Sequence, residues 1–347
     1  MKELSNLYID KPDEEIREKV KEIWDGIAKP IKGLGQFERI FSQIGAITGS
    51  THIDISKKAV IVMCADNGIV EEGVTQYGQE MTTIIASSMV MGDTSVCKMA
   101  KVAGADILPV DIGINREDEI PGMIQRNIAH GTRNFKKEPA MSQEDALKAI
   151  ETGIAMAAEC KKEGYNLLAT GEMGIGNTTT SSAMTAALLQ CRVEDVTGNG
   201  AGLTKEGLDH KVEVIKEVLD QYNFQKSEAL RILATVGGYD IAGLTGVFIG
   251  GAIHHIPVVM DGVISGVAAL TAERLLPGVK DYIIPSHMSK EPAAVKIMKE
   301  LELHPVIDAE MALGEGTGAV MMFSLLDVAL SLYDNRVTFE DINRIGK

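Results

Sequence analysis

Short apolar runs, each followed by a polar turn, recur along this chain and limit the folds that it can adopt. Residues 59–65 read AVIVMCA and end at Asp66-Asn67-Gly68. A run of this length without polar alternation is typical of a strand buried on both faces. Four more runs have the same form, at 106–110, 166–169, 256–260 and 282–284, and they end at Asp111, Thr170-Gly171-Glu172, Asp261-Gly262 and Pro285-Ser286-His287.

Segments rich in small residues, such as 179–189 and 244–253, separate these strands and have the character of helices. Alternating strands and helices of this kind predict a parallel sheet covered by helices on both faces, which is a three-layer α/β architecture. The two ends of the chain read mainly as helices with charged faces. We therefore expect a smaller helical domain from residues 1–50 and 288–347, or caps over the sheet, beside an α/β domain from residues 51–287.

The formal net charge of −15 argues against a nucleic-acid binder, because such proteins rely on clustered Lys and Arg. A small anionic substrate stays possible, since a few local donors can outweigh the overall field. The four cysteines are scattered and lack the spacing of a metal site or of a secreted disulfide framework. The N-terminal segment has no signal-peptide pattern, and no apolar run reaches the roughly 18 residues that a membrane span needs. We expect a cytoplasmic protein with reduced thiols.

Chemically distinctive residues stand directly after the predicted strands. In an open parallel sheet the ligand crevice lies at the carboxyl ends of the strands. An Asp at such a position more often caps the following helix. The repetition of polar residues at the same place in successive strands favours a functional site, and the candidates are Asp66, Asp111, Glu172, Asp261 and His287.

Three glycine-rich runs are the sharpest local signals, and they read GEMGIGNTT at 171–179, TGNGAG at 197–202 and LGEGTG at 313–318. Glycines allow backbone N–H groups to approach an anion, and a following helix adds partial positive charge at its start. One such run is more often a tight turn, but three together favour phosphate binding. There is no Walker A loop and no G-x-G-x-x-G fingerprint, which argues against ATP use by that route and against a dinucleotide oxidoreductase.

Glu315 lies between two glycines, just before an apolar helix. A Glu near a helix start commonly does no more than complement the helix dipole. Here, however, we expect few polar groups around the Glu315 carboxyl. A poorly solvated carboxyl has a raised pKa, which suits proton abstraction. Glu172 has the same Gly-Glu context after another strand. Two carboxylates at one crevice with a phosphate loop predict deprotonation of a nucleophile that attacks a phosphorylated sugar.

Lys211 lies in the amphipathic segment LDHKVEVIKEVL, where a Lys is usually a solvated surface residue. Its functional role depends on the preceding glycine run being the phosphate site. His287 can hydrogen-bond locally, and the chain has no H-E-x-x-H or paired-His spacing. We therefore expect no metal site.

The chain resembles the nicotinate-nucleotide:dimethylbenzimidazole phosphoribosyltransferase family of cobamide biosynthesis. The motifs that carry the resemblance keep their order over nearly the whole chain: VMCADNGIVEEGV (62–74), GEMGIGNTTTSSAM (171–184), TGNGAGL (197–203), DHKV (209–212), GGYDIAGLTG (237–246), PVVMDGVISGVAAL (257–270), PSHMSKEP (285–292) and LGEGTGA (313–319).

The resemblance implies a Rossmann-like sheet with a smaller helical domain built from both chain ends, assembled as a dimer. It implies transfer of phosphoribose from nicotinate mononucleotide to a lower-ligand base, giving an α-linked ribotide and nicotinate, with no metal and no cofactor. Nicotinate attached through its ring nitrogen is a cationic leaving group, so C1′ of the ribose is electrophilic. A carboxylate at Glu172 or Glu315 would stabilise the positive charge that builds on the sugar.

By the same resemblance, Glu315 is the general base that deprotonates the incoming aglycon, and Glu172 assists nearby. Lys211 and the loops at 174–178 and 200–202 correspond to phosphate and ribose contacts. The residues expected to bind substrate are Gly174, Gly176, Asn177, Thr178, Gly200, Gly202, Lys211, Asp261, Ser286, Tyr77, Ile85 and Leu313.

Several positions depart from the family pattern. Tyr77 and Ile85 stand where benzimidazole-using relatives have a Ser and a Gln near the base, and Ala312 replaces an Arg that often precedes LGEG. Asn67 replaces a frequent His, and residues 30–35 read PIKGLG where well-known members have PPGSLG. Loss of polar partners for a ring nitrogen favours another aglycon, as in the family branch that makes phenolic cobamides with paired, unlike subunits.

Two other readings stay open. In one, this chain is a subunit that completes the site of a homologous partner instead of acting alone. In the other, which the absent fingerprint disfavours, it is a nucleotide-dependent oxidoreductase.

Overall fold

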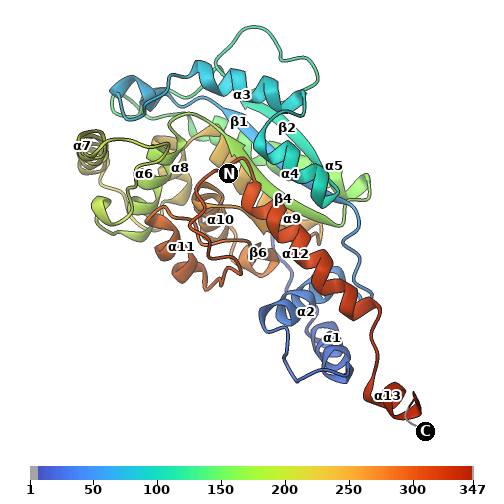
Figure 1. Cartoon of the computed structure of the whole chain (residues 1–347). Coiled ribbons are helices and arrows are strands. Elements are labelled where there is room, and N and C mark those ends of the chain that lie inside the picture. Colours follow the sequence, from blue (N-terminus) through green and yellow to red (C-terminus); the bar gives the residue numbers. More distant parts are fainter. Residues whose placement is uncertain (1–6, 346–347) are drawn as a thin grey trace.

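Six parallel strands form one sheet at the centre of the described chain, residues 7–345 of a computed structural model (Figure 1). The strand order is β3-β2-β1-β4-β5-β6, as in a Rossmann-like fold. The five predicted strands are confirmed, while the two-residue β3 is too short to leave a sequence signal. Their bounds are β1 Lys58–Ala65, β2 Ala105–Gly113, β3 Ile124–Gln125, β4 Leu167–Met173, β5 Val258–Met260 and β6 Ile283–Pro285.

The central strand β1 is buried along its whole length, which explains why its sequence has no polar alternation. Ala59, Ile61 and Met63 pack into the core on one face of the sheet. Val60 and Val62, which alternate with them, pack into a second core on the opposite face. Both faces of the sheet therefore need a layer of helices.

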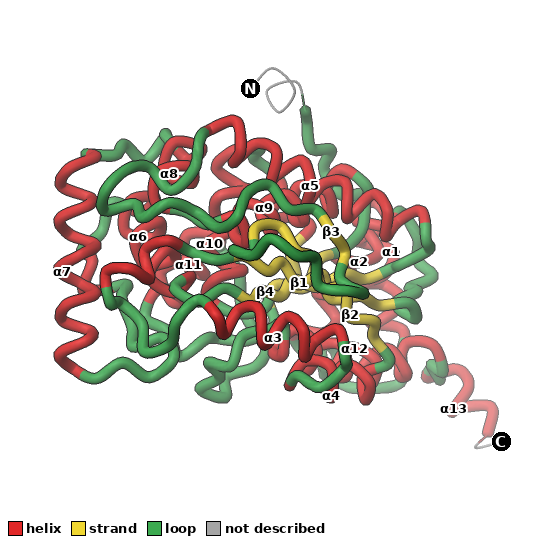
Figure 2. The backbone as a smooth tube through the Cα atoms, turned by 90° about the horizontal axis from the view of Figure 1, so that it is seen from above, coloured by secondary structure: helices red, strands yellow, loops and turns green. Residues whose placement is uncertain are grey.

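Helices cover both faces, so the predicted three-layer α/β class is confirmed; Figure 2 shows the strands between the two helical layers. The layer that carries the larger core contains α5 Gln143–Lys162, α6 Asn177–Leu189, α7 Lys205–Tyr222, α8 Ala229–Val236, α9 Tyr239–Ile253, α10 Val263–Leu275 and α11 Ala293–Leu301. The opposite layer contains α3 Glu80–Val90, α4 Ser95–Ala103 and α12 Thr317–Asp334. Short 3-10 turns connect these elements at η2 Gly68–Glu72, η3 Val193–Asp195 and η4 Val279–Tyr282.

The chain ends form helices α1 Glu14–Gly26, α2 Gln36–Thr48 and α13 Phe339–Ile345. Trp24 of α1 packs between α2 and α12. Its ring centroid lies 5.9 Å from that of Phe41 of α2 and 5.1 Å from that of Tyr333 near the end of α12. In contrast, α11 packs against α10 in the main body. The division of the chain into two domains, with its borders, stays a prediction.

Helix α12 links the sheet to the end of the molecule formed by α1 and α2, because it begins at the sheet and ends beside these two helices (Figure 1). Within residues 7–345 it is the one helix whose length and composition would allow a membrane crossing, which differs from our expectation of no such segment. However, 56% of this helix is buried within the fold, as is common for a core helix.

Helices α5 and α9 cross with their backbones in contact, and glycines permit this. A Cβ built on Gly246 of α9 would overlap the carbonyl oxygen of Ile150 of α5, and one built on Gly153 would overlap that of Gly243. Helices this close leave no space for a side chain at the crossing point.

Replacement of Gly246 by Ala should therefore lower the free energy of unfolding by about 3 kcal/mol, since backbone atoms cannot move aside as a side chain does. Urea unfolding at fixed pH would measure the change. The matched control is Gly26→Ala in α1, where the added Cβ meets no atom within 4 Å. Equal stability of the two variants would contradict the proposed backbone contact.

Candidate active site

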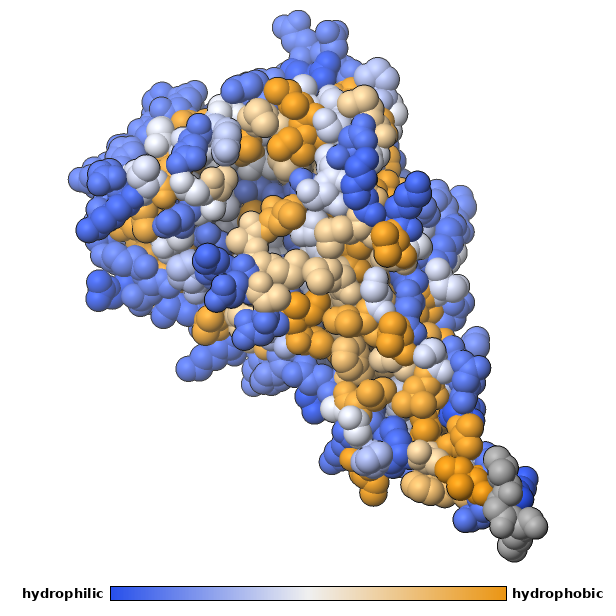
Figure 3. All heavy atoms as spheres, in the orientation of Figure 1, coloured by the Kyte–Doolittle hydropathy of each residue, from blue (hydrophilic) through white to orange (hydrophobic). Residues whose placement is uncertain are grey.

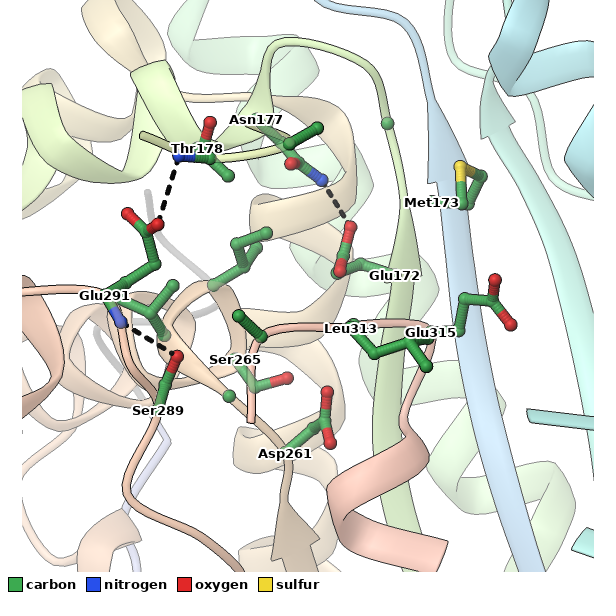
Figure 4. Close-up of a pocket in the computed structure, with 18 of the residues that line it drawn as sticks. Glu172, Met173, Asn177, Thr178, Asp261, Ser265, Ser289, Glu291, Leu313 and Glu315 are labelled. Carbon is green, nitrogen blue, oxygen red and sulfur yellow. Dashed lines mark hydrogen bonds between the residues drawn. The ribbon is translucent and has the colours of Figure 1, made fainter. Parts of the chain in front are cut away.

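A cavity of about 420 Å³ opens at the carboxyl ends of β4, β5 and β6. From β1 the chain adds β2 and β3 on one side of the sheet, and then β4, β5 and β6 on the other side. The strand order therefore reverses between β1 and β4, and the cavity lies beside this point. Figure 4 shows side chains from the end of β4, the start of α6 and the loop before α12 around one space. Ten predicted site residues line it: Tyr77, Ile85, Glu172, Gly174, Asn177, Thr178, Gly200, Asp261, Leu313 and Glu315.

The other four predicted site residues lie outside this lining. Gly176 precedes α6 with φ +94° and lines a small neighbouring cavity, and Lys211 lies behind Thr178. The backbone oxygen of Gly202 accepts a hydrogen bond from the Gln76 amide. The Ser286 hydroxyl is buried and donates to the Met260 carbonyl at 2.7 Å, so it ties β6 to β5 in the empty protein.

Glu172 at the end of β4 is a buried carboxyl in a crowded acidic environment. The Asn177 amide donates to Glu172 and also, at 3.0 Å, to Asp240 at the start of α9. Burial, together with the negative charge of Asp240, raises the pKa of Glu172 to about 8. Glu172 is therefore mostly protonated at neutral pH while the cavity is empty.

Asp240 was not predicted as a site residue. Its side chain is fully buried, and burial raises its pKa to about 6. The backbone N–H of Ile241 donates to one oxygen at 2.9 Å and Asn177 donates to the other. The sequence places Asp240 in the first turn of a helix, where an acidic residue is ordinary, so only the tertiary contact reveals its link to Glu172.

Glu315 has an unusual backbone, with φ +60° between Gly314 at +85° and Gly316 at +98°. A non-glycine residue in this region costs about 1–2 kcal/mol, and such strain persists where the surroundings impose it. The Val96 N–H at the start of α4 donates to the Glu315 carboxylate at 3.0 Å, so our expectation of little polar company was wrong. In Figure 4 this carboxylate points away from Glu172 and Asp261, at the edge of the cavity.

Asp261 at the end of β5 is a third buried carboxyl in the cavity wall. The Ala319 N–H in the first turn of α12 donates to it at 3.1 Å, and the His287 ring nitrogen lies 4.0 Å away. Burial raises the pKa of Asp261, and the neighbouring His287 opposes this shift. The start of α12 therefore interacts with Asp261 and also follows directly from Glu315.

Positive charge next to the cavity comes from Lys211 on α7, whose side chain is fully buried behind Thr178. Its ammonium donates to the Thr178 hydroxyl at 3.1 Å and to the Gly198 carbonyl at 3.2 Å. Burial lowers the pKa of Lys211 to about 8. The surface role that is usual for a Lys on such a helix does not apply, because Lys211 connects two of the three glycine-rich runs.

The opposite end of the cavity is apolar. Its apolar lining consists of Met81 and Ile85 of α3 with Met173, Leu313 and Ile264, and the half-exposed Tyr77 also contributes. Ser265 in the cavity wall is 1% exposed, and its hydroxyl has no hydrogen-bond partner within the described residues. The sequence-based prediction did not include Ser265, Ser289 or Glu291, although all three line the cavity.

Comparisons with known proteins identify the family and the fold of this chain. A model of the phosphoribosyltransferase family DBI_PRT matches residues 9–343. The nicotinate-nucleotide–dimethylbenzimidazole phosphoribosyltransferase of Acetivibrio thermocellus is 42% identical over 98% of this chain and 96% of its own length, and the Clostridium acetobutylicum protein of that name is 44% identical over 95% and 94%. The crystal structure of CobT from Thermus thermophilus superposes with a TM-score of 0.89 at 34% identity, covering 95% of this chain and 98% of that one.

The raised pKa of Glu172 predicts a pH-dependent stability difference. Between pH 4.5 and 8 the unfolded chain has lost the Glu172 proton and the folded chain retains it, so this residue lowers stability as pH rises through that window. In Glu172→Gln the effect is absent. The free energy of unfolding of the variant, relative to wild type, should increase by the order of a few kcal/mol from pH 5 to pH 8.5.

Urea titrations at pH 5, 6.5 and 8.5 would measure this difference. Glu151→Gln on the exposed face of α5 removes the same charge outside the site and should show a constant difference. A difference that is also constant for Glu172→Gln would mean that Glu172 is ionised in the empty protein.

Proposed function

This chain belongs to the phosphoribosyltransferase family that matches residues 9–343, and we propose that it transfers phosphoribose from nicotinate mononucleotide to an aromatic aglycon. It is thus a pentosyltransferase enzyme, and the proposed products are an α-linked ribotide and nicotinate. One observation carries the proposal: a single cavity joins a lysine-backed glycine turn, a set of buried carboxyls and an apolar wall. The proposal includes action in the cytoplasm on small molecules, without metal, cofactor, nucleic acid or membrane.

The donor phosphate binds at the end of the cavity formed by the glycine-rich runs. The turn before α6 and the loop at Gly200 bring backbone groups together there. Lys211 supplies a positive charge next to them, and its burial keeps this charge weakly hydrated. A helix start and a lysine are common partners of phosphate. Gly174 and Gly202 lie in these loops and Thr178 in the first turn of α6, and all three stay proposed contacts of the phosphate and ribose.

The buried carboxyls suit the cationic ring nitrogen of the donor. The pyridinium ring of nicotinate mononucleotide carries a positive charge, and Glu172, Asp240 and Asp261 are carboxyls whose pKa values are raised in its absence. A cation placed beside them favours their ionised forms. We propose that donor binding releases a proton from this group and that the resulting negative charge stabilises the oxocarbenium character of C1′ in the transition state.

In the transfer step, the bond between C1′ and the pyridine nitrogen breaks and its electron pair stays with nicotinate. The aglycon forms the new bond to C1′ and loses its proton to Glu315, which acts as general base. The N-terminus of α4 holds the Glu315 carboxylate at the cavity edge through Val96, so a small rotation of the side chain is required to reach the aglycon. Asp261 and Ser286 remain candidate substrate contacts.

The aglycon occupies the apolar end, between Ile85, Met173 and Leu313. The first candidate aglycon is dimethylbenzimidazole, which the names of the similar proteins contain. The second candidate is a phenol, because Ile85 stands where benzimidazole-using relatives have a Gln and cannot form a hydrogen bond with a second ring nitrogen. A chain that completes the site of a homologous subunit is the remaining alternative.

Purified protein incubated with nicotinate mononucleotide and either dimethylbenzimidazole, a purine, phenol or p-cresol should release nicotinate and form a ribotide of matching mass. Glu315→Gln should lower the rate at least about 100-fold, since the general base is lost. Glu310→Gln, an exposed neighbour in the same loop, is the matched control and should keep the wild-type rate. Wild-type turnover by Glu315→Gln would refute the assignment, and use of dimethylbenzimidazole alone would refute the phenol alternative.

We also propose a dimer, as the family resemblance implies, formed through α12. One face of this helix exposes Met321, Leu325, Val328 and Leu332, and Figure 3 shows the resulting hydrophobic strip. This strip begins next to the loop that carries Glu315, so the proposed partner is a second, homologous chain that covers it.

Val328, which is 73% exposed, provides the test. Val328→Glu should reduce the molar mass in light scattering from that of a dimer to that of a monomer, because a charge at the centre of an apolar interface is strongly unfavourable. Val295→Glu on α11 places the same charge on another exposed valine and should leave the dimer intact. A monomeric wild-type chain that becomes active only with a homologue would instead favour the heteromeric alternative.

A further inference from the structure

The carboxylate of Glu291 occupies the end of the cavity where the donor phosphate is proposed to bind. The backbone N–H of Gly200 donates to Glu291 Oε1 at 3.1 Å. Figure 4 marks the hydrogen bond to the Glu291 carboxylate with a dashed line. A Cβ built on Gly198 would overlap the other carboxylate oxygen, so this loop accommodates Glu291 only because residue 198 is a glycine. A negatively charged group of the protein therefore lies against a glycine loop of the type that binds anions.

The local chain holds Glu291 in this position. Its backbone N–H donates to the Ser289 hydroxyl at 3.4 Å, and Pro292 directly after it is the N-cap of α11. The Glu291 carbonyl accepts a hydrogen bond from Ala294 at 3.0 Å in the first turn of that helix. These contacts fix the backbone, whereas the carboxylate itself is held by Gly200 and can move without unfolding α11.

Glu291 also supplies the charge that balances Lys211. The Lys211 ammonium is fully buried, and both of its hydrogen bonds go to uncharged oxygens, those of Thr178 and Gly198. The negative charge of Glu291 opposes the effect of burial on the pKa of Lys211. An ammonium has three N–H donors, so at least one remains for a further acceptor.

We infer that Glu291 is an internal counter-anion that occupies the phosphate subsite and is displaced when the donor phosphate binds. This inference rests on the proposed function, since it takes the subsite to be that of the donor phosphate. A carboxylate and a phosphate dianion cannot share the Gly200 N–H and the field of Lys211, because like charges at this separation repel. Glu291 thereby weakens the binding of small free anions at this subsite, and it returns to the subsite as the product leaves.

The test is calorimetric titration of the full chain with inorganic phosphate. Glu291→Gln keeps the shape of the side chain but removes its charge, and it should bind phosphate about tenfold more tightly than wild type. Inorganic phosphate should also become a correspondingly stronger competitive inhibitor against nicotinate mononucleotide. Lys211→Met should lose phosphate binding, which verifies that the titration reports this subsite.

Two further variants complete the design. Glu213→Gln, exposed on the same helix as Lys211, removes an equal charge outside the cavity and should bind phosphate as wild type does. Glu291→Asp shortens the side chain and should give an intermediate affinity, so the inference stays testable if the Gln variant fails to fold. Circular dichroism identifies misfolded variants.

Unchanged or weaker phosphate binding in folded Glu291→Gln would overturn the inference and would indicate that Glu291 holds another part of the substrate. Absence of measurable binding by both wild type and variant would overturn it as well. The titration needs no turnover, whereas the proposed function fails if nicotinate is not released. The two failures are therefore distinguishable.

Discussion

The rest of this structure depends on burial of several carboxyl groups at one edge of a parallel sheet. Glu172, Asp240 and Asp261 are almost inaccessible to water, and their pKa values are all raised. The protein reduces the cost with hydrogen-bond donors: one Asn177 amide serves two carboxyls, and the first turn of α12 serves the third. Burial of several carboxyls is costly by itself and becomes favourable beside a cationic group, so this edge of the sheet is suited to a cationic ligand.

Glycines make this arrangement possible by allowing backbone and carboxyl groups to approach closely. A side chain on Gly174 would approach the Asp240 carboxylate to 2.6 Å, and one on Gly314 would approach Glu172 to 2.8 Å. The Gly171 position is crowded by the Glu315 carbonyl in the same way. Thus the glycines beside Glu172 and Glu315 do more than form turns, because they let the end of β4 and the loop before α12 pack against each other.

The sequence predicts those parts of the structure that depend on local patterns. β1 was recognisable because a strand buried on both faces must be apolar throughout. Glu172 and Glu315 were recognisable as cavity residues because Gly171 precedes the first and Gly314 and Gly316 enclose the second. Asp240, Ser265 and Glu291 were not, since their roles arise from contacts between segments far apart in the chain. Ser286 was predicted as a substrate contact, but the sequence could not reveal that its hydroxyl already has a backbone acceptor in the empty protein.

Helix α12 acts as a rigid connection between distant parts of the molecule. Its first turn contacts Asp261 and continues from Glu315, and its last turn lies against Trp24. An 18-residue helix is about 27 Å long, so a tilt of roughly 3° moves one end by about 1.4 Å. A displacement on the order of 1 Å at a reacting group can change a rate about 100-fold. A small shift at the far end of this helix would therefore also move Glu315, the proposed general base.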